Sequence, residues 1–184
     1  MTNQDGQLSA LTADALPAVL GLEEVCFAPA DRWSESSWRF ELEQAAAAPA
    51  EPTAAQRAAH SVCAITSEHG EQLAALAAFS VVAEDAELLR VMTHPQQRRR
   101  GLAAKLLAAG VSWAQRHQAT RMLLEVEADN QPAIQLYHDF GFEHLTLRAD
   151  YYGPGRAALI MTRELNRENL PREELNWEGS AEND

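Results

Sequence analysis

A basic segment in the middle of the chain has the composition of an anion-binding site. Arg98, Arg99 and Arg100 precede Gly101, and an apolar helical pattern begins directly after them at Leu102. The first backbone N–H groups of a helix lack internal partners, and the helix dipole makes that end partly positive. Arginines oppose the dipole unless an anion binds there, and a glycine lets a phosphate approach the backbone closely. The segment therefore predicts a phosphate or pyrophosphate site; the alternatives are a solvated basic helix start or a small nucleic-acid patch.

The overall composition narrows the kind of partner. The chain has 184 residues, 46% of them hydrophobic, and a net charge of -12. These values are typical of one soluble globular domain and argue against general nucleic-acid binding, which relies on basic surface. An acidic surface suits a basic partner, although many proteins are acidic merely to stay in solution. The phosphate-loop motifs GxxxxGK[ST] and GxGxxG are both absent.

The sequence indicates a cytoplasmic protein without a metal centre. It contains no run of about 18 or more apolar residues, so no membrane span is expected. Its first residues lack the basic start and apolar stretch of a signal peptide. Cys26 and Cys63 lie in apolar surroundings and are expected to be buried, reduced thiols. No His/Cys cluster has the spacing of metal ligands.

Two helices are expected in the first part of the chain. Residues 15–27 carry apolar side chains at helical spacing, and Asp14 is placed to cap that helix. Residues 32–48 predict a second helix, with Ser34 as its cap. Residues 48–59 are rich in proline and alanine and predict a loop or mobile insert.

The remainder alternates between strands and helices. Apolar runs at 61–66, 72–84 and 86–94 predict an antiparallel meander, which Pro95 ends. A helix is expected at 101–117, with an apolar face formed by Leu102, Leu106, Ala109 and Trp113. A strand at 120–128 follows, and then a helix at 130–140 that is capped by Asn130 and stopped by Gly141. Two closing strands are expected at 142–152 and 156–165. This order predicts one mixed α/β (α+β) domain over residues 1–165. Residues 166–184 are expected to form an acidic, mobile tail.

Two segments resemble the acyl-CoA core of the GNAT N-acetyltransferase superfamily. They are RVMTHPQQRRRGLAAKLLAAGVSWA at 90–114 and LLEVEADNQPAIQLYHDFGF at 123–142, and the resemblance extends from about Leu11 to Leu165. The R-x-x-G-x-A pattern at 98–103 matches that family's pyrophosphate loop. The resemblance implies the GNAT fold, a central, mostly antiparallel twisted sheet flanked by helices, with acetyl-CoA as cosubstrate and no metal.

Within this superfamily the chain is most similar to the RimI-type ribosomal-protein alanine N-acetyltransferases. The segments DRWSESSW at 31–38 and RADYYGPGRAALIM at 148–161 add to that resemblance. It implies transfer of acetyl to the N-terminal alanine of a small-subunit ribosomal protein. It also implies Glu125 as general base and Tyr137 as general acid. The cofactor-binding residues that it implies are Val91, Met92 and Thr93 for the acetyl-pantetheine arm, Arg99, Arg100, Gly101, Leu102, Ala103 and Ala104 for the pyrophosphate, and Asn130.

The chemistry of acetyl transfer is compatible with these two side chains. An α-amine has a pKa of about 8 and must lose a proton before it can attack. Glu125 lies between apolar residues, where desolvation is expected to raise the pKa of its carboxyl group. The alternative is a solvated strand carboxylate, or one paired with an arginine such as Arg121. Tyr137, whose phenol has a pKa of about 10, can share or donate a proton to the leaving thiolate, whose thiol has a pKa of about 8.5. The alternative is that Tyr137 is a core residue with its hydroxyl at the rim.

Further residues bear on the mechanism and on the acceptor. A backbone N–H near residues 91–93 is expected to stabilise the oxyanion. Because no Ser/His/Asp or Cys/His set is visible, direct attack in a ternary complex is favoured over an acyl-enzyme. His94 is expected to be a turn residue. Trp33 and Trp38 are expected in the core near the acceptor groove, and Tyr151 and Tyr152 in its wall.

The chain departs from the family pattern where the acceptor would bind. Arg156, Ala157 and Ala158 stand where the family usually carries acidic residues. The acceptor therefore has alternatives: a small amine, a free amino acid or a lysine side chain, since fold and cofactor site do not fix it. An alternative of another class is an acyl-CoA-binding module without turnover.

Overall fold

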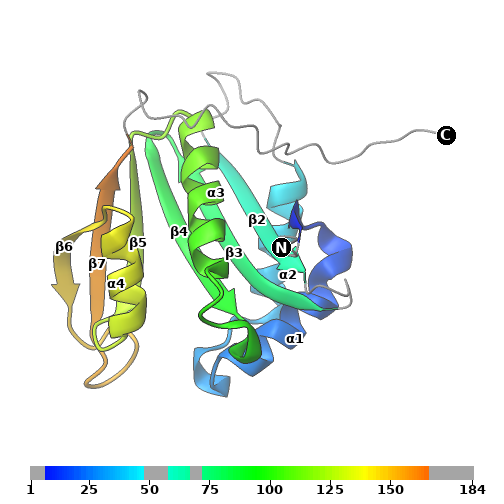
Figure 1. The fold of residues 1–184 in the computed structure, drawn as a ribbon, viewed down its shortest axis with the longest axis horizontal. Helices are drawn as coiled ribbons and strands as arrows, with labels where there is room; N and C mark the ends of the chain where they lie inside the picture. Colours follow the sequence, from blue (N-terminus) through cyan, green and yellow to red (C-terminus); the bar gives the residue numbers. More distant parts are fainter. Residues whose placement is uncertain (1–6, 48–57, 67–71, 166–184) are drawn as a thin grey trace, which may run out of the picture.

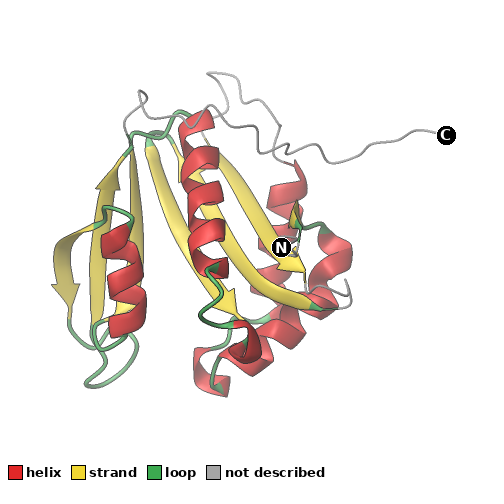
Figure 2. Cartoon of the chain, viewed as in Figure 1, coloured by secondary structure: helices red, strands yellow, loops and turns green. Residues whose placement is uncertain are grey.

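A seven-stranded sheet forms the centre of the computed structural model, which describes residues 7–47, 58–66 and 72–165 (Figures 1 and 2). The strands are β1 (Leu8–Ala10), β2 (Ala58–Thr66), β3 (Leu73–Val82), β4 (Asp85–Thr93), β5 (Arg121–Glu127), β6 (Glu143–Arg148) and β7 (Ala158–Glu164). Their order in the sheet is β1-β2-β3-β4-β5-β7-β6. Among the strands of the described residues, only the β4–β5 pair is parallel. The mixed α+β fold with a mostly antiparallel sheet is therefore confirmed.

Helices cover both faces of the sheet. The helices are α1 (Leu16–Cys26), α2 (Glu35–Ala47), α3 (Leu102–Arg116) and α4 (Gln131–Asp139), with short 3-10 helices at Ala13–Ala15, Pro29–Asp31 and Pro95–Gln97. In Figure 1, α3 and α4 lie in front of the sheet, and α1 and α2 lie behind it. None of the helices in the described ranges is long and apolar enough to cross a membrane.

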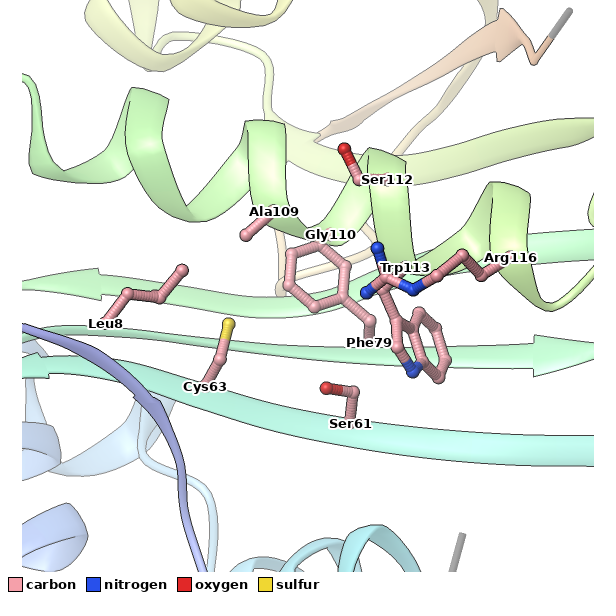
Figure 3. A pocket seen from close by; sticks show the side chains of 9 residues that line it. All are labelled: Leu8, Ser61, Cys63, Phe79, Ala109, Gly110, Ser112, Trp113 and Arg116. Atoms are coloured by element: carbon pink, nitrogen blue, oxygen red, sulfur yellow. The ribbon is translucent and has the colours of Figure 1, made fainter. Parts of the chain in front are cut away.

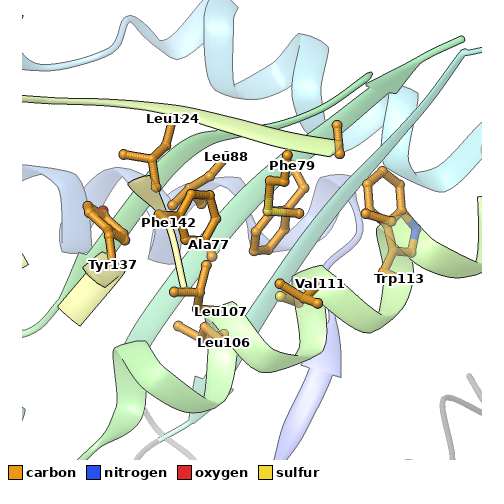
Figure 4. Packing of buried hydrophobic residues seen from close by; sticks show 14 of the residues in the cluster. Ala77, Phe79, Leu88, Leu106, Leu107, Val111, Trp113, Leu124, Tyr137 and Phe142 are labelled. Carbon is orange, nitrogen blue, oxygen red and sulfur yellow. The ribbon is translucent and has the colours of Figure 1, made fainter. Parts of the chain in front are cut away.

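Strand β3 is buried on both faces because its side chains alternate between two clusters. Ala77 and Phe79 pack with α3, whereas Leu76 and Ala78 pack with α1 and α2. Figure 4 shows Phe79 among the α3 side chains. A strand covered on both faces is expected to read as a continuous apolar run, as β3 does.

Helix α3 packs tightly on this strand through a glycine. A Cβ built at Gly110 would lie 2.1 Å from the Phe79 ring. Because Gly110 has no side chain, the Phe79 ring packs directly against the backbone of α3. This contact sets the distance between α3 and the sheet, and with it the position of the basic helix start.

Several local sequence predictions are confirmed. Ser34 caps α2 by accepting a hydrogen bond from the Ser37 N–H at 3.1 Å. Asn130 caps α4 by accepting from the Ala133 N–H at 3.3 Å. Gly141, with φ 78°, follows the end of α4. The meander β2–β3–β4 and the β6–β7 pair are also present.

Other predictions were wrong or incomplete. Asp14 does not cap α1, because the chain already turns in a 3-10 helix at Ala13–Ala15 and Ala15 occupies the cap position. The insert predicted at 48–59 is too long: Ala58 and Ala59 belong to β2, where they pair with Val82 and Val81. Strand β1 was not predicted. Residues 48–57 of the insert and the tail at 166–184 lie outside the described residues.

Candidate active site

Strands β4 and β5 pair at one end and then separate. The parallel ladder joins Asp85–Leu88 to Arg121–Leu124, although β4 continues to Thr93 and β5 to Glu127. Figure 1 shows the two strands diverging beyond this point. The cause lies in β4: Leu88 pairs with Phe79 and Arg90 with Ala78, so Leu89 is an extra residue. Such a β-bulge bends its strand and ends regular pairing.

The predicted acetyl-pantetheine segment lies on the separated part of β4. Val91, Met92 and Thr93 pair with β3 on one side, and the ladder to β5 has ended before them. Their backbone groups on the β5 side are therefore outside the sheet ladder. The Thr93 carbonyl accepts from the Cys26 thiol at 3.5 Å and from Arg98 Nε at 3.5 Å.

The helix start that follows has no side-chain cap. Gly101 occupies the cap position of α3 in the left-handed conformation, φ 75°, and makes no side-chain cap bond. The first-turn N–H groups over residues 102–104 are thus left for an outside acceptor. A Cβ built at Gly101 meets nothing within 4 Å, so the approach to the helix start is open.

The arginines surround this open helix start. Arg98, Arg99 and Arg100 are all exposed. Arg99 also has a positive φ of 63°, and Arg100 Nη1 donates to Gln97 Oε1 at 2.5 Å. A pyrophosphate requires hydrogen-bond donors, and here the free N–H groups of the helix start and the guanidinium groups supply them. The glycine leaves room for the phosphate, so the residues present fit that part of acetyl-CoA.

Two neighbouring predictions have different outcomes. His94 is a turn residue, as predicted: its Nδ1 accepts from the Gln96 N–H at 3.3 Å. The side-chain oxygen of Asn130 caps α4, and a contact of Asn130 with the cofactor stays a prediction.

Glu125 follows the last residue of β5 that pairs with β4. Its side chain is 24% exposed, and Oε1 accepts a hydrogen bond from Arg148 Nη1 of β6 at 2.9 Å. The predicted alternative of a carboxylate paired with an arginine is therefore present, but the partner is Arg148 and not Arg121, which binds Asp85 at 2.5 and 2.8 Å. A hydrogen bond with Glu125 is the largest cause of a raised Tyr151 pKa, so the phenol of Tyr151 also lies beside this carboxylate.

Tyr137 is a buried residue of the α3–α4 side. It is 4% exposed and packs against Phe142, with 6.0 Å between ring centroids (Figure 4). Burial, and secondarily Tyr152, raises the pKa of Tyr137 well above its usual value. The phenol is therefore protonated throughout the neutral range, but its burial also corresponds to the predicted alternative of a core residue.

Tyr152 connects the two predicted catalytic side chains electrostatically. Burial is the main cause that raises the pKa of Tyr152 to about 12, and the charge of Glu125 is the second cause. Tyr152 in turn raises the pKa of Tyr137. Tyr151 and Tyr152 thus lie close to Glu125, and their place in the wall of an acceptor groove stays a prediction.

A second carboxylate near Glu125 was missed in the sequence. Glu87 of β4 alternates with Ala86 and Leu88, whose side chains belong to the α3 cluster, so Glu87 points to the opposite face, as Glu125 does. Desolvation, then the charges of Glu125 and Glu41, raises the Glu87 pKa although the side chain keeps solvent contact. The alternation in 86–88 was the signal that could have identified it.

Charged pairs organise the segment between α1 and α2. Glu23, 1% exposed, forms an ion pair with Arg90 and accepts from the Trp38 Nε1–H at 3.2 Å. Trp38 is fully buried, as predicted, and lies 4.9 Å from Trp33. Arg90, which the sequence did not single out, lies 3.5 Å above the Phe27 ring. This network holds the α1–α2 connection against β4.

A small pocket lies elsewhere, at the β1–β2 edge under α3. Its lining includes Leu8, Ser61, Cys63, Trp113 and Arg116 (Figure 3). None of the predicted catalytic or cofactor-binding residues lines it. The candidate site is therefore the separation of β4 and β5 and not this pocket.

Comparisons with known proteins agree with this geometry. The ribosomal protein bS18-alanine N-acetyltransferase of Salmonella typhimurium is 35% identical over 82 residues, which are 45% of this chain and only 55% of the relative. The crystal structure of the ribosomal-protein-S18-alanine N-acetyltransferase from Escherichia coli has a TM-score of 0.71 and 26% identity, covering 87% of this chain and 94% of that chain.

A third comparison concerns the fold alone. An acetyltransferase from Salmonella typhimurium, solved with its cofactor acetyl-CoA, has a TM-score of 0.69 at 16% identity, covering 88% of this chain and 94% of that one. The acetyltransferase (GNAT) family itself matches residues 27–142. The resemblance seen in the sequence is thereby confirmed, and this chain belongs to the acetyltransferase (GNAT) family.

Proposed function

We propose that this protein uses acetyl-CoA to acetylate the N-terminal α-amine of a protein that begins with alanine, and that this acceptor is a basic ribosomal protein. The observation that carries the proposal is the separation of β4 and β5 directly before an uncapped basic helix start. The names of the relatives support the choice of acceptor. Such an acceptor would place the enzyme in the cytoplasm.

The residues around the separation have distinct proposed roles. The backbone over Arg99–Ala104 holds the pyrophosphate of acetyl-CoA, and the backbone of Val91–Thr93 holds the arm that leads to the acetyl group. When bound, acetyl-CoA supplies an activated acetyl thioester. Glu125 accepts the proton that the acceptor amine loses, directly or through a water. Tyr137 holds a proton at its hydroxyl on the opposite side of β5.

The electrostatics of the Glu125 side favour a cationic acceptor. Glu87 and Glu125 lie on the face of the sheet that carries α1 and α2, and Glu41 of α2 is close enough to affect the Glu87 pKa. The whole chain carries a net charge of -12. Complementary charge speeds encounter and helps to select the partner, so a basic N-terminal peptide is a better match than an acidic one.

The proposal is tested by measuring thiol release from acetyl-CoA with a panel of acceptors, with mass spectrometry locating the acetyl group. The panel contains basic peptides that begin with alanine, the same peptides with a blocked N-terminus, lysine peptides and small amines. We expect acetylation of the free alanine N-terminus alone, and faster turnover of a basic peptide than of its acidic counterpart.

Other outcomes would contradict specific parts of the proposal. Preference for a small amine, a free amino acid or a lysine would overturn the acceptor while leaving the cofactor site in place. Tight acetyl-CoA binding without turnover of any acceptor would overturn the catalytic proposal in favour of a binding module.

A further inference from the structure

One arginine joins three segments that are distant in the sequence. Arg156 belongs to the β6–β7 loop, residues 149–157. Its guanidinium binds the Glu127 carboxylate at the end of β5 through two hydrogen bonds, Nε to Oε1 at 2.6 Å and Nη2 to Oε2 at 3.1 Å. Its Nη1 donates to Asp31 Oδ1 at 2.8 Å, in the short helix between α1 and α2, and to the Tyr152 carbonyl at 3.4 Å. A planar guanidinium is suited to such forked recognition, which an ammonium group cannot reproduce.

The same loop is also held at its other end. Arg148, the last residue of β6, binds Glu125, and Arg156 binds Glu127, so two carboxylates on one face of β5 anchor the two ends of the loop. Each arginine lies near a tyrosine ring of the loop: Arg148 is 5.5 Å from the ring centroid of Tyr151, and Arg156 is 5.8 Å from that of Tyr152.

Backbone hydrogen bonds close the loop between its two anchored ends. The Tyr152 N–H donates to the Arg156 carbonyl at 3.1 Å, and the Arg156 N–H donates to the Gly153 carbonyl at 2.9 Å. The Gly155 N–H donates to Asp150 Oδ1 at 2.6 Å. These bonds close the turn that sets Tyr151 and Tyr152 beside Glu125.

The ion pairs of Arg156 also affect which carboxylates remain for a cationic acceptor. Asp31 and Glu127 lie near each other and both form ion pairs with Arg156, so the three side chains together keep one negative charge. Glu87 makes no ion pair among the described residues, and it lies on the Glu125 side of the sheet. Arg156 thus pairs with carboxylates at the end of β5 and between α1 and α2, while Glu87 stays exposed on the Glu125 side of the sheet.

We propose that Arg156 is a positioning residue for the acceptor: it clamps the β6–β7 loop to Glu127 and Asp31 and so holds Tyr151 and Tyr152 in the wall against which the acceptor binds. The part that concerns the acceptor rests on the proposed function. The part that concerns the loop stands on the contacts of Arg156 alone.

The test compares Arg156→Gln, which removes the charge and the fork, with Arg156→Lys, which keeps the charge. Arg121→Gln is the matched control, because Arg121 makes a similar forked pair with Asp85 at the other end of β5. Hydrogen–deuterium exchange of residues 149–157 is measured in the protein alone. The KM values for acceptor and for acetyl-CoA, and kcat, are measured with whichever acceptor the wild type uses.

We expect Arg156→Gln to speed amide exchange at Tyr152 and Arg156 and to raise the acceptor KM roughly tenfold, with little change in the acetyl-CoA KM. Arg156→Lys should have an exchange rate and an acceptor KM between those of Arg156→Gln and the wild type. Arg121→Gln should match the wild type in both measurements. Glu127→Gln alone should also speed amide exchange and raise the acceptor KM. Added to Arg156→Gln it should change both quantities little further, since the contact between the two side chains is already lost.

Unchanged exchange and unchanged acceptor KM in Arg156→Gln would overturn the proposal. Faster exchange with an unchanged acceptor KM would overturn the acceptor part and keep the clamp. Full rescue by Arg156→Lys would show that charge alone matters and would overturn the forked clamp. If the wild type acetylates nothing, the proposed function and the acceptor part fail together, while the exchange data still decide whether Arg156 holds the loop.

Discussion

Glu125 and Tyr137 lie on opposite sides of strand β5. Leu124 and Val126 belong to the cluster that contains Tyr137, and Glu125, between them in the strand, points to the other face. A group that reaches both side chains must therefore lie where β4 and β5 have separated. This relationship places the proposed base on one side of the sheet and the proposed acid on the other, so the two proposed roles can be tested separately by mutation.

Glu125→Gln should lower kcat roughly 100-fold near neutral pH, because the acceptor amine is then largely protonated and loses its base. The deficit should narrow above pH ~8, where the amine loses its proton without help. A pH–rate profile measures this, with Glu143→Gln on the exposed strand β6 as control. Wild-type turnover of Glu125→Gln at neutral pH would remove Glu125 from the mechanism.

Tyr137→Phe should reduce turnover roughly 100-fold while acetyl-CoA still binds. The substitution keeps the buried ring and its packing on Phe142, so the fold should be unaffected. Since burial raises the pKa of Tyr137, the wild type should show no loss of the acid in the neutral range. Calorimetric titration of acetyl-CoA and steady-state kinetics check both points; an unimpaired variant would leave Tyr137 as a core residue only.

Gly101→Glu should weaken acetyl-CoA binding by roughly 100-fold or more, because it puts a negative charge at the helix start where the pyrophosphate is proposed to bind. Gly101→Ala is the control for backbone strain. It should cost about 1 kcal/mol of stability at φ 75° but keep most of the affinity, since its Cβ meets nothing within 4 Å. Equal affinity of the Glu variant and the wild type would remove the pyrophosphate site from this helix start.

Gly110→Ala should lower the free energy of unfolding by about 1–3 kcal/mol, because the new Cβ would lie 2.1 Å from the Phe79 ring. Gly21→Ala is the matched control in a helix: its Cβ meets nothing within 4 Å, and it should stabilise the protein by about 0.5–1 kcal/mol. Urea unfolding measures both. If Gly110→Ala is as stable as Gly21→Ala, α3 does not depend on this close approach.

The Arg156 clamp should make stability depend on pH in the acid range. Hydrogen bonds from Arg156 lower the pKa of Asp31 and of Glu127 below their usual values. Carboxylates with a lowered folded pKa contribute stability above the unfolded pKa of about 4, and lose it as pH falls through the folded pKa. The Tm difference between wild type and Arg156→Gln should therefore be constant from neutral pH down to about 5, shrink as pH falls below about 4, and vanish only below the lowered folded pKa values of the two carboxylates. A difference that does not shrink below pH about 4 would exclude these carboxylates as its source.

Local signals in the sequence predicted most of the elements around the site. Ser34 and Asn130 cap the helices they precede, and Gly141 follows the end of α4, because each acts through atoms a few residues away. The apolar runs at residues 72–84 and 86–94 predicted β3 and β4 for the same reason. The basic helix start at Gly101 was likewise visible in a short segment.

Elements whose placement depends on distant residues were misjudged or missed. Strand β1 exists because Leu8, Ser9 and Ala10 find partners in β2, more than fifty residues later. Ala58 and Ala59 extend β2 because β3 offers Val82 and Val81 opposite them, although the local composition is that of a loop. Asp14 failed as a cap because the preceding turn already supplied the helical start.

The sequence by itself determined the mixed α+β fold class and the basic helix start, since these depend on local periodicity, capping and residue type, while Glu125 and Tyr137 were indicated by the resemblance to the GNAT family. Only the tertiary structure decided that β7 lies between β5 and β6, and that Glu125 pairs with Arg148 and not with Arg121. It alone brought Arg156 to Asp31, 125 residues away. Ion pairs of this kind follow from how the strands and loops assemble, and no local pattern specifies which charged side chains will meet.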